Sequence, residues 1–258
     1  MAAIDEIYRY LNEIAPFSTA MDFDNAGFLV GDGKTEVTKV LVTLDITAQS
    51  VRQAREKGAQ LIVSHHPVIF QPLKRLLSNS VPYLLAKEGI GAICAHTNLD
   101  MAPGGVNDCL AAALGLSGRM GVAFYGELPC CVMGTLAQPM KPKSFAAFVK
   151  ERLSCEGIRY VAGNRPVKKV ALCSGAGGEF LFDAMEKGAD AFVTGEVKHH
   201  EILAAKEAGL TWWTAGISRL RISPWNRFGR DSPGRFRKLN FSWRKTPATA
   251  SVIYSSMS

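Results

Sequence analysis

The sequence predicts an α/β protein of two lobes, each with a mixed or parallel sheet covered by helices. Short apolar runs rich in β-branched residues alternate with amphipathic stretches, which is typical of sheets with helices on their faces. The alternation occurs twice, with a boundary near residues 118–128. We therefore expect lobes over residues 1–125 and 126–211. No unbroken apolar run approaches the ~20 residues that a membrane helix needs, so no membrane partner is expected.

The first half begins with a helix over residues 3–14, because Ile4, Ile7 and Leu11 recur at spacings of three and four. A β-branched run at 37–45 predicts a buried strand, and Gly58 is a typical helix terminator. The same reasoning predicts further strands over 60–64 and 91–96, and helices over 47–58, 81–88 and 105–114.

The second half repeats this order. We expect strands over 130–138, 168–175 and 191–195, and helices over 141–154, from Gly178 to Gly188, and over 199–208. After Gly209 another buried strand is expected, but the chain from Thr211 onward shows no sustained period of either kind.

The composition changes abruptly at the same point. Residues 212–258 hold nine Lys/Arg, one Asp/Glu and all four tryptophans, although the whole chain has a net charge of +7. The preceding 211 residues carry 21 basic and 22 acidic side chains. Nucleic acid is therefore not expected as a partner, because the basic character belongs to the tail alone.

The six cysteines show no CxxC spacing and mostly lie in apolar segments, so we expect buried, reduced thiols. The acidic, amphipathic N-terminus does not resemble a secretory signal. A cytoplasmic location is expected.

Three of the five histidines stand at the ends of predicted strands. His65 and His66 follow the strand over 60–64, and His96 ends the strand over 91–96, with Asp100 four residues later. Ligands bind at the carboxyl ends of strands in open α/β sheets. Adjacent histidines on an extended strand point in opposite directions, so Pro67 favours the turn that both need to face one centre. Imidazoles with a carboxylate suit Zn²⁺, Fe²⁺, Mn²⁺ or Co²⁺.

Several motifs resemble those of the GTP cyclohydrolase I type 2-like family over residues 1 to about 211. They are MDFDNAGFLVGD (21–32), LDIT (44–47), SHHPVIF (64–70), AHTNLD (95–100) and GADAFVTGEVKHH (188–200). The resemblance implies a two-lobed protein that assembles into toroidal homohexamers, with two divalent metal ions (Zn, Fe or Mn) in a cleft between the lobes.

By that resemblance His65, His66 and Asp100 are metal ligands, and Asp100 is a plausible bridge between two ions. His96 is a ligand or a neighbour of the ligands, and is our candidate for catalytic proton transfer.

Other polar positions have competing interpretations. Asp24 and Asn25 favour a turn over a catalytic element. Asp45 is either a partner of a metal ligand or a helix N-terminal carboxylate. The glycines at 175–178 favour a tight turn over a phosphate cradle, because no GxGxxG or Walker lysine is present.

Glu196, His199 and His200 lie where a strand meets a helix, and we expect them to line the site without binding metal.

Family members complete the metal site with a late GGHxxTE or AGHxxTE motif, but this chain has Ile217 and Arg221 at the expected His and Glu positions. Neither side chain is an ordinary metal ligand. Because tryptophan has the single codon TGG, reading Trp212 and Trp213 one nucleotide earlier gives an apolar residue and then valine, as a final strand requires. We therefore interpret residues 212–258 as an out-of-frame tail with little regular structure. This chain is then expected to hold one metal ion or none.

The function expected from the resemblance is metal-dependent hydrolysis of a purine nucleotide ring, impaired by the altered tail. The alternative is a non-enzymatic metal-binding regulatory or adaptor protein. A metal-dependent phosphoesterase fits the ligand types as well.

Overall fold

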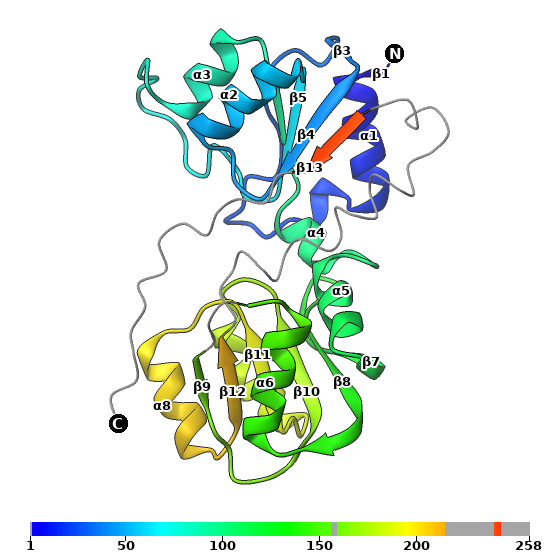
Figure 1. Cartoon of the computed structure of the whole chain (residues 1–258), viewed down its shortest axis with the longest axis vertical. Helices are drawn as coiled ribbons and strands as arrows, with labels where there is room; N and C mark the ends of the chain where they lie inside the picture. Colours follow the sequence, from blue (N-terminus) through cyan, green and yellow to red (C-terminus); the bar gives the residue numbers. More distant parts are fainter. Residues whose placement is uncertain (1, 156–158, 215–239, 244–258) are drawn as a thin grey trace.

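The computed structural model describes residues 2–155, 159–214 and 240–243. Two sheets with their helices form two lobes, stacked along the long axis of the molecule (Figure 1). Within the part of the chain described, every helix is too short or too polar to cross a lipid bilayer.

The first lobe holds a sheet in the order β13-β4-β5-β6-β2. Its strands are β13 (Asn240–Trp243), β4 (Lys39–Thr43), β5 (Leu61–Ser64), β6 (Gly91–Cys94) and β2 (Gly27–Val30). All are parallel except the edge strand β2. Since Thr43 pairs with Ser64, and Ser64 with Cys94, the carboxyl ends of the three central strands meet at one edge.

Helices cover this sheet: α1 (Ile4–Ile14), α2 (Ala48–Lys57) and α3 (Val81–Lys87). Most of the face of α1 that the sequence predicted is buried, with Ile4, Ile7 and Leu11 at most 1% exposed, but Ile14 at the end of the helix is 39% exposed. Thr47 caps the N-terminus of α2, because its hydroxyl accepts a hydrogen bond from the Ser50 amide. A short ladder of β1 (Ala2–Ala3) and β3 (Glu36–Val37) and the turn η1 (Phe17–Thr19) complete the lobe.

Two short helices lead from β6 to the second lobe: α4 (Thr97–Met101) and α5 (Val106–Ala113). Asn107 on α5 is 3% exposed and reaches two strands of the second lobe. Its amide nitrogen donates to the Cys130 carbonyl, and its amide oxygen accepts from the Ser174 amide nitrogen. These contacts fix α5 against the second sheet.

The second sheet has the order β7-β8-β10-β11-β12-β9. Its strands are β7 (Ser117–Tyr125), β8 (Leu128–Met140), β10 (Val167–Cys173), β11 (Ala191–Thr194), β12 (Thr211–Thr214) and β9 (Arg159–Val161). The central β10, β11 and β12 are parallel, and the outer strands are antiparallel. The lobe also contains α6 (Pro142–Arg152), η2 (Gly178–Phe180), α7 (Leu181–Glu186) and α8 (His199–Glu207).

The α/β class of the sequence prediction is confirmed. The second sheet begins with β7 at Ser117, next to the range 118–128 in which the sequence predicted the boundary between the lobes. Within the tail expected to have little regular structure, the described residues are the end of β12 and the whole of β13, each paired with a neighbouring strand. Ile217 and Arg221 lie outside the described residues.

Candidate functional site

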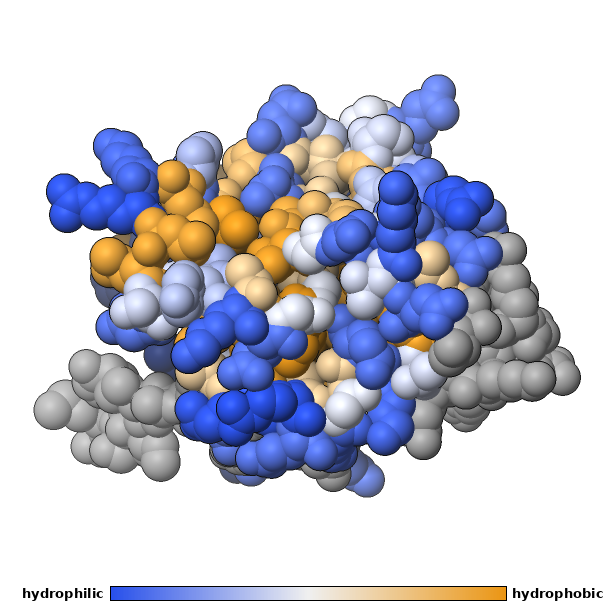
Figure 2. Space-filling model, turned by 90° about the horizontal axis from the view of Figure 1, so that it is seen from above, coloured by the Kyte–Doolittle hydropathy of each residue, from blue (hydrophilic) through white to orange (hydrophobic). Residues whose placement is uncertain are grey.

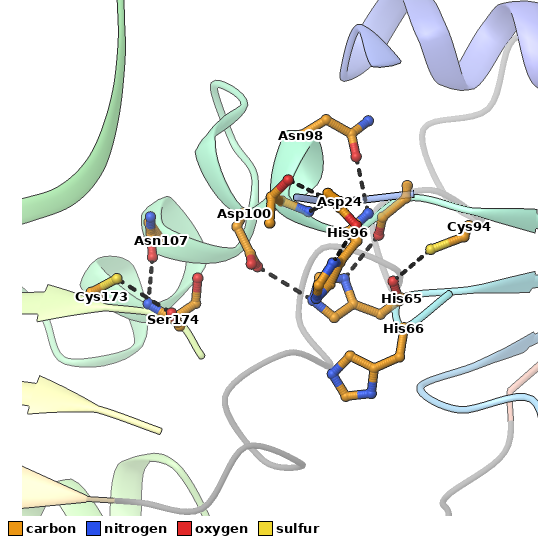
Figure 3. A network of polar contacts seen from close by, with 12 residues as sticks. Asp24, His65, His66, Cys94, His96, Asn98, Asp100, Asn107, Cys173 and Ser174 are labelled. Carbon is orange, nitrogen blue, oxygen red and sulfur yellow. Dashed lines mark hydrogen bonds and ion pairs between the residues drawn. The ribbon is translucent and has the colours of Figure 1, made fainter. Parts of the chain in front are cut away.

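Three histidines meet where β5 and β6 end. The ring centroids of His65, His66 and His96 lie 5.1–5.6 Å apart. One ligating nitrogen of each ring lies within 4.8 Å of those of the other two. The sequence prediction that these strand ends bring the imidazoles together is confirmed (Figure 3).

A turn directly after β5 lets two adjacent histidines face the same centre. The amides of His65 and His66 both donate to the Leu44 carbonyl, at 3.2 and 2.9 Å. The Ser64 hydroxyl donates to the His66 carbonyl at 2.8 Å. The extended strand therefore ends at Ser64, before the two histidines, so their rings need not point in opposite directions.

Each imidazole is held through its Nδ1 atom. His65 Nδ1 lies 2.9 Å from the Ala95 carbonyl, His66 Nδ1 lies 2.6 Å from an Asp45 carboxylate oxygen, and His96 Nδ1 lies 2.8 Å from an Asp24 carboxylate oxygen. Such partners fix the ring orientation and leave Nε2 of each imidazole as the nitrogen available to a metal ion. The open question about Asp45 is thereby answered, since its carboxylate orients His66.

Asp24 has a larger role than the turn that the sequence favoured. One carboxylate oxygen contacts His96, and the other accepts hydrogen bonds from the Thr97 amide and hydroxyl. Although burial alone would raise the pKa of Asp24, the hydrogen bonds from His96 and Thr97 hold it below its ordinary value. The carboxylate stays ionised, which suits a partner that orients an imidazole.

Asp100 stands on α4, one helical turn after His96. Its amide donates to the His96 carbonyl at 2.9 Å, and its Oδ1 lies 3.4 Å from His65 Nε2. Both residues are enclosed, with His65 0% and Asp100 8% exposed. The carboxylate therefore lies beside the imidazole cluster, as the sequence predicted.

Two histidines of the cluster, His66 and His96, line a cavity of about 270 Å³ to which both lobes contribute. The first lobe contributes Phe23, His66, His96 and Asp100, and the second contributes Cys130, Glu179 and Phe180 among others. Burial, together with the negative charges of Glu179 and Asp183, raises the pKa of the Cys130 thiol. Cys130 is therefore a neutral wall residue at ordinary pH.

The structure does not support the site-lining role that the sequence predicted for Glu196, His199 and His200. Glu196, His199 and His200 are exposed, and none of them lines the cavity. Helix α8 begins at His199, and Glu196 lies in the segment before it.

The glycine turn after β10 is compact, as the sequence favoured. The Gly175 carbonyl accepts hydrogen bonds from the Gly195 and Glu196 amides and from the Thr194 hydroxyl. A Cβ atom at Gly178 would collide with the Glu201 carboxylate. This packing fixes Glu179 and Phe180 at the cavity.

The sequence did not identify the contribution of the second lobe. Cys130, Glu179 and Phe180 carry no motif, and only the topology brings them opposite the histidines. The signal available for Asp24 was its place in MDFDNAGFLVGD (21–32), one of the motifs that carry the family resemblance.

Comparison with known proteins gives concordant results. The family model described as Duf34/NIF3 (NGG1p interacting factor 3) matches residues 2–217. A Clostridium perfringens protein named GTP cyclohydrolase 1 type 2 homolog is 32% identical over 217 residues, covering 80% of this chain and 82% of the relative. A Lactococcus lactis protein of the same name is 35% identical over 208 residues, covering 76% and 79%.

Solved structures share the fold. A crystal structure of a Staphylococcus aureus hypothetical protein superposes with a TM-score of 0.84 at 28% identity, covering 97% of this chain and 99% of the other. A Bacillus cereus protein related to NIF3 has a TM-score of 0.85 at 22% identity, covering 98% and 99%. Together with the match over residues 2–217, these similarities show that the chain belongs to the DUF34/NIF3 (NGG1p interacting factor 3) family, whose curated relatives include the GTP cyclohydrolase 1 type 2 homologs.

Proposed function

We propose that this protein binds a divalent metal ion through His65, His66, His96 and Asp100 and hydrolyses the ring of a purine nucleotide. The observation that supports the metal site most strongly is the imidazole cluster, with Nδ1 of each ring anchored and ligating atoms within 4.8 Å. The nucleotide substrate is suggested by the name that the Clostridium perfringens and Lactococcus lactis relatives carry.

The donor set fits Zn²⁺, Fe²⁺ or Mn²⁺, since imidazole nitrogens and a carboxylate suit all three. When bound, such an ion supplies Lewis acidity and lowers the pKa of a bound water to about 7. The residues of the chain supply orientation, because Asp24 and Asp45 fix the tautomers of His96 and His66. The geometry favours His96 as a ligand over the proton carrier that the sequence suggested, because Asp24 occupies Nδ1 and a metal ion would occupy Nε2.

A matched set of histidine variants tests this proposal. We expect His65→Ala and His96→Ala to lose metal, measured by mass spectrometry of the purified protein, and to lose GTP ring opening, measured by chromatography. His199→Ala and His200→Ala are the controls, because both residues are exposed and outside the cavity. Equal metal content in all four variants would rule out the proposed ligands. Metal binding without turnover of GTP, GMP or a phosphodiester would favour the adaptor function.

We further propose that the site is impaired relative to that of family members. Arg221 and Ile217 replace the expected Glu and His, and a fixed positive charge near the site would oppose a second dication. One metal ion per chain is therefore expected. The DNA around codon 211 tests the frame-change hypothesis, which fails if no single-base slip there restores a GHxxTE motif.

A further inference from the structure

The cavity has a second wall whose chemistry the metal ligands do not explain. Phe180 and Glu179 come from η2 of the second lobe, and Phe23 comes from the segment before β2 of the first. Among the described residues that line the cavity there is no lysine or arginine. The described wall therefore offers aromatic surface and one carboxylate, but no cation for a phosphate group.

Phe23 is an exposed aromatic residue on a fixed segment. Its side chain is 59% exposed, although it lines the cavity beside the imidazole cluster. The preceding Asp22 amide donates to the Tyr125 hydroxyl of the second lobe at 3.0 Å, and the following Asp24 holds His96. The Phe70 ring lies 6.4 Å away between centroids. An exposed phenyl ring on a fixed backbone is a suitable surface for a planar base to stack on.

Glu179 is the ionisable side chain of the second-lobe wall. It is exposed, and among the described residues no cationic side chain forms an ion pair with it. Its negative charge acts on the cavity, because it contributes to the raised pKa of the Cys130 thiol. The packed glycine turn holds its backbone: the Gly177 amide donates to the Thr194 hydroxyl at 2.9 Å. A carboxylate in this position accepts hydrogen bonds and donates none.

The purine bases differ in the hydrogen-bonding groups that they would present to a carboxylate such as that of Glu179. In guanine, the N1–H and 2-amino donors lie on the edge opposite C8, which is the carbon attacked in ring opening. A carboxylate can accept from both donors at once. Adenine presents an acceptor at N1, which a carboxylate repels, and hypoxanthine presents N1–H without the 2-amino group.

We propose that Glu179 recognises the N1–H and 2-amino edge of a guanine base stacked on Phe23, with C8 directed toward the histidine cluster. The orientation of C8 rests on the proposed function, whereas the base preference does not depend on hydrolysis. Glu179 and Phe23 are then the residues through which the protein selects the base of its nucleotide.

Equilibrium titration of the full-length protein with GMP, IMP and AMP, as purified and after addition of Zn²⁺, tests the base preference. These nucleotides share sugar and phosphate, so only the base differs. We expect GMP to bind roughly 10-fold tighter than IMP and roughly 100-fold tighter than AMP, because each mismatch leaves a polar group unpaired. Glu179→Gln should weaken the binding of GMP roughly 10-fold and leave the affinity for AMP unchanged. Glu186→Gln is the control, since Glu186 is exposed on α7 and outside the cavity.

The stacking surface has its own matched pair of variants. Phe23→Ala should weaken the binding of all three nucleotides roughly 5- to 150-fold, because stacking on an aromatic ring depends little on the base. Phe182→Ala is the control, because Phe182 is 60% exposed and does not line the cavity.

The outcomes separate this inference from the proposed function. Equal binding of the three nucleotides, no binding of any, or identical behaviour of Glu179→Gln and Glu186→Gln would overturn the inference, and metal-dependent ring opening could still stand. A GMP preference that depends on Glu179 in a protein that binds no metal would support the inference and refute the proposed function.

Discussion

At the scale of single residues, hydrogen bonds to Nδ1 organise the candidate metal centre. Asp24, Asp45 and the Ala95 carbonyl each contact one imidazole at 2.6–2.9 Å. Partners of this kind typically change metal affinity by roughly 10- to 100-fold when removed. They account for the way the ends of two neighbouring strands, β5 and β6, present three imidazoles to one centre.

Asp24→Asn tests that role. The amide keeps the size of the side chain but loses the charge that orients His96, so we expect metal affinity to fall roughly 10- to 100-fold. Competition with a chromogenic chelator measures the affinity. Asp32→Asn is the control, because Asp32 is exposed and caps a turn by accepting from the Lys34 amide. Unchanged affinity in Asp24→Asn would show that the carboxylate is only structural.

The buried Cys131 predicts a dependence of stability on pH. Burial raises the pKa of this thiol far above its ordinary value of 9.0. Below pH 9.0 the thiol is protonated in the folded and in the unfolded protein, so the free energy of unfolding does not depend on its titration. As the pH rises from 9.0 toward the folded-state pKa, the thiol ionises only in the unfolded protein, and the free energy of unfolding falls. Cys131→Ala is the reference, because the cavity that it leaves lowers the free energy of unfolding by an amount that does not depend on pH. Above pH 9 we expect the wild type to lose about 1.4 kcal/mol per pH unit relative to the variant, measured by urea unfolding. Parallel curves would contradict this.

These residues show what the sequence could and could not predict. His65, His66, His96 and Asp100 were predictable because they end buried strands or follow them closely. Asp24 was interpreted mainly as a turn, because its contact with His96 spans 72 positions of the chain and leaves no local pattern. His199 and His200 were placed at the site by their position after β11, but α8 begins there and leaves both side chains exposed.

At the scale of elements, the alternation of apolar and amphipathic segments located the central strands of both sheets and most helices. The strands that escaped prediction are short or lie at sheet edges, such as β2, β9 and β13. Edge strands bury less apolar surface, so their sequences show a weaker period. Strand β7 was missed because Gly118 and Gly121 interrupt its pattern.

Strand β13 covers the edge of β4, pairing Phe241 with Val40 and Trp243 with Val42. Deleting residues 240–258 should expose that edge, remove a few ladder hydrogen bonds at about 0.5–1.5 kcal/mol each, and promote aggregation. Deleting only residues 244–258 is the control, because it leaves β13 in place. Thermal unfolding and light scattering measure both effects. If the two truncated proteins behave alike, β13 does not stabilise the first lobe.

At the scale of the whole molecule, the first lobe presents an apolar surface to solvent. Figure 2 shows apolar side chains gathered on one side of the face seen from above, and the exposed apolar residues of this lobe include Phe70, Leu73, Leu76 and Leu77. Exposed apolar surface of this kind marks interaction sites. It supports, as a prediction, the homo-oligomer that the family resemblance implies.

Sedimentation velocity tests the assembly. We expect an oligomer, a hexamer if the resemblance holds in full, and we expect Leu76→Asp to shift it toward smaller species because a charge opposes burial of the surface. Leu203→Asp, a residue on α8 that is 48% exposed, is the control. A monomeric wild type would contradict the prediction, and equal effects of both substitutions would place the interface elsewhere.

The arrangement of the two lobes places the imidazole cluster and the wall with Glu179 on one cavity. The central claim is that this cluster ligates a divalent metal ion. X-ray absorption spectroscopy of the Zn²⁺-loaded protein tests it most directly. We predict three imidazole nitrogens at about 2.0–2.1 Å with at least one oxygen, and loss of imidazole scattering in His65→Ala, His66→Ala and His96→Ala. A spectrum without imidazole ligands, or one unchanged in these variants but altered in His199→Ala or His200→Ala, would contradict the account.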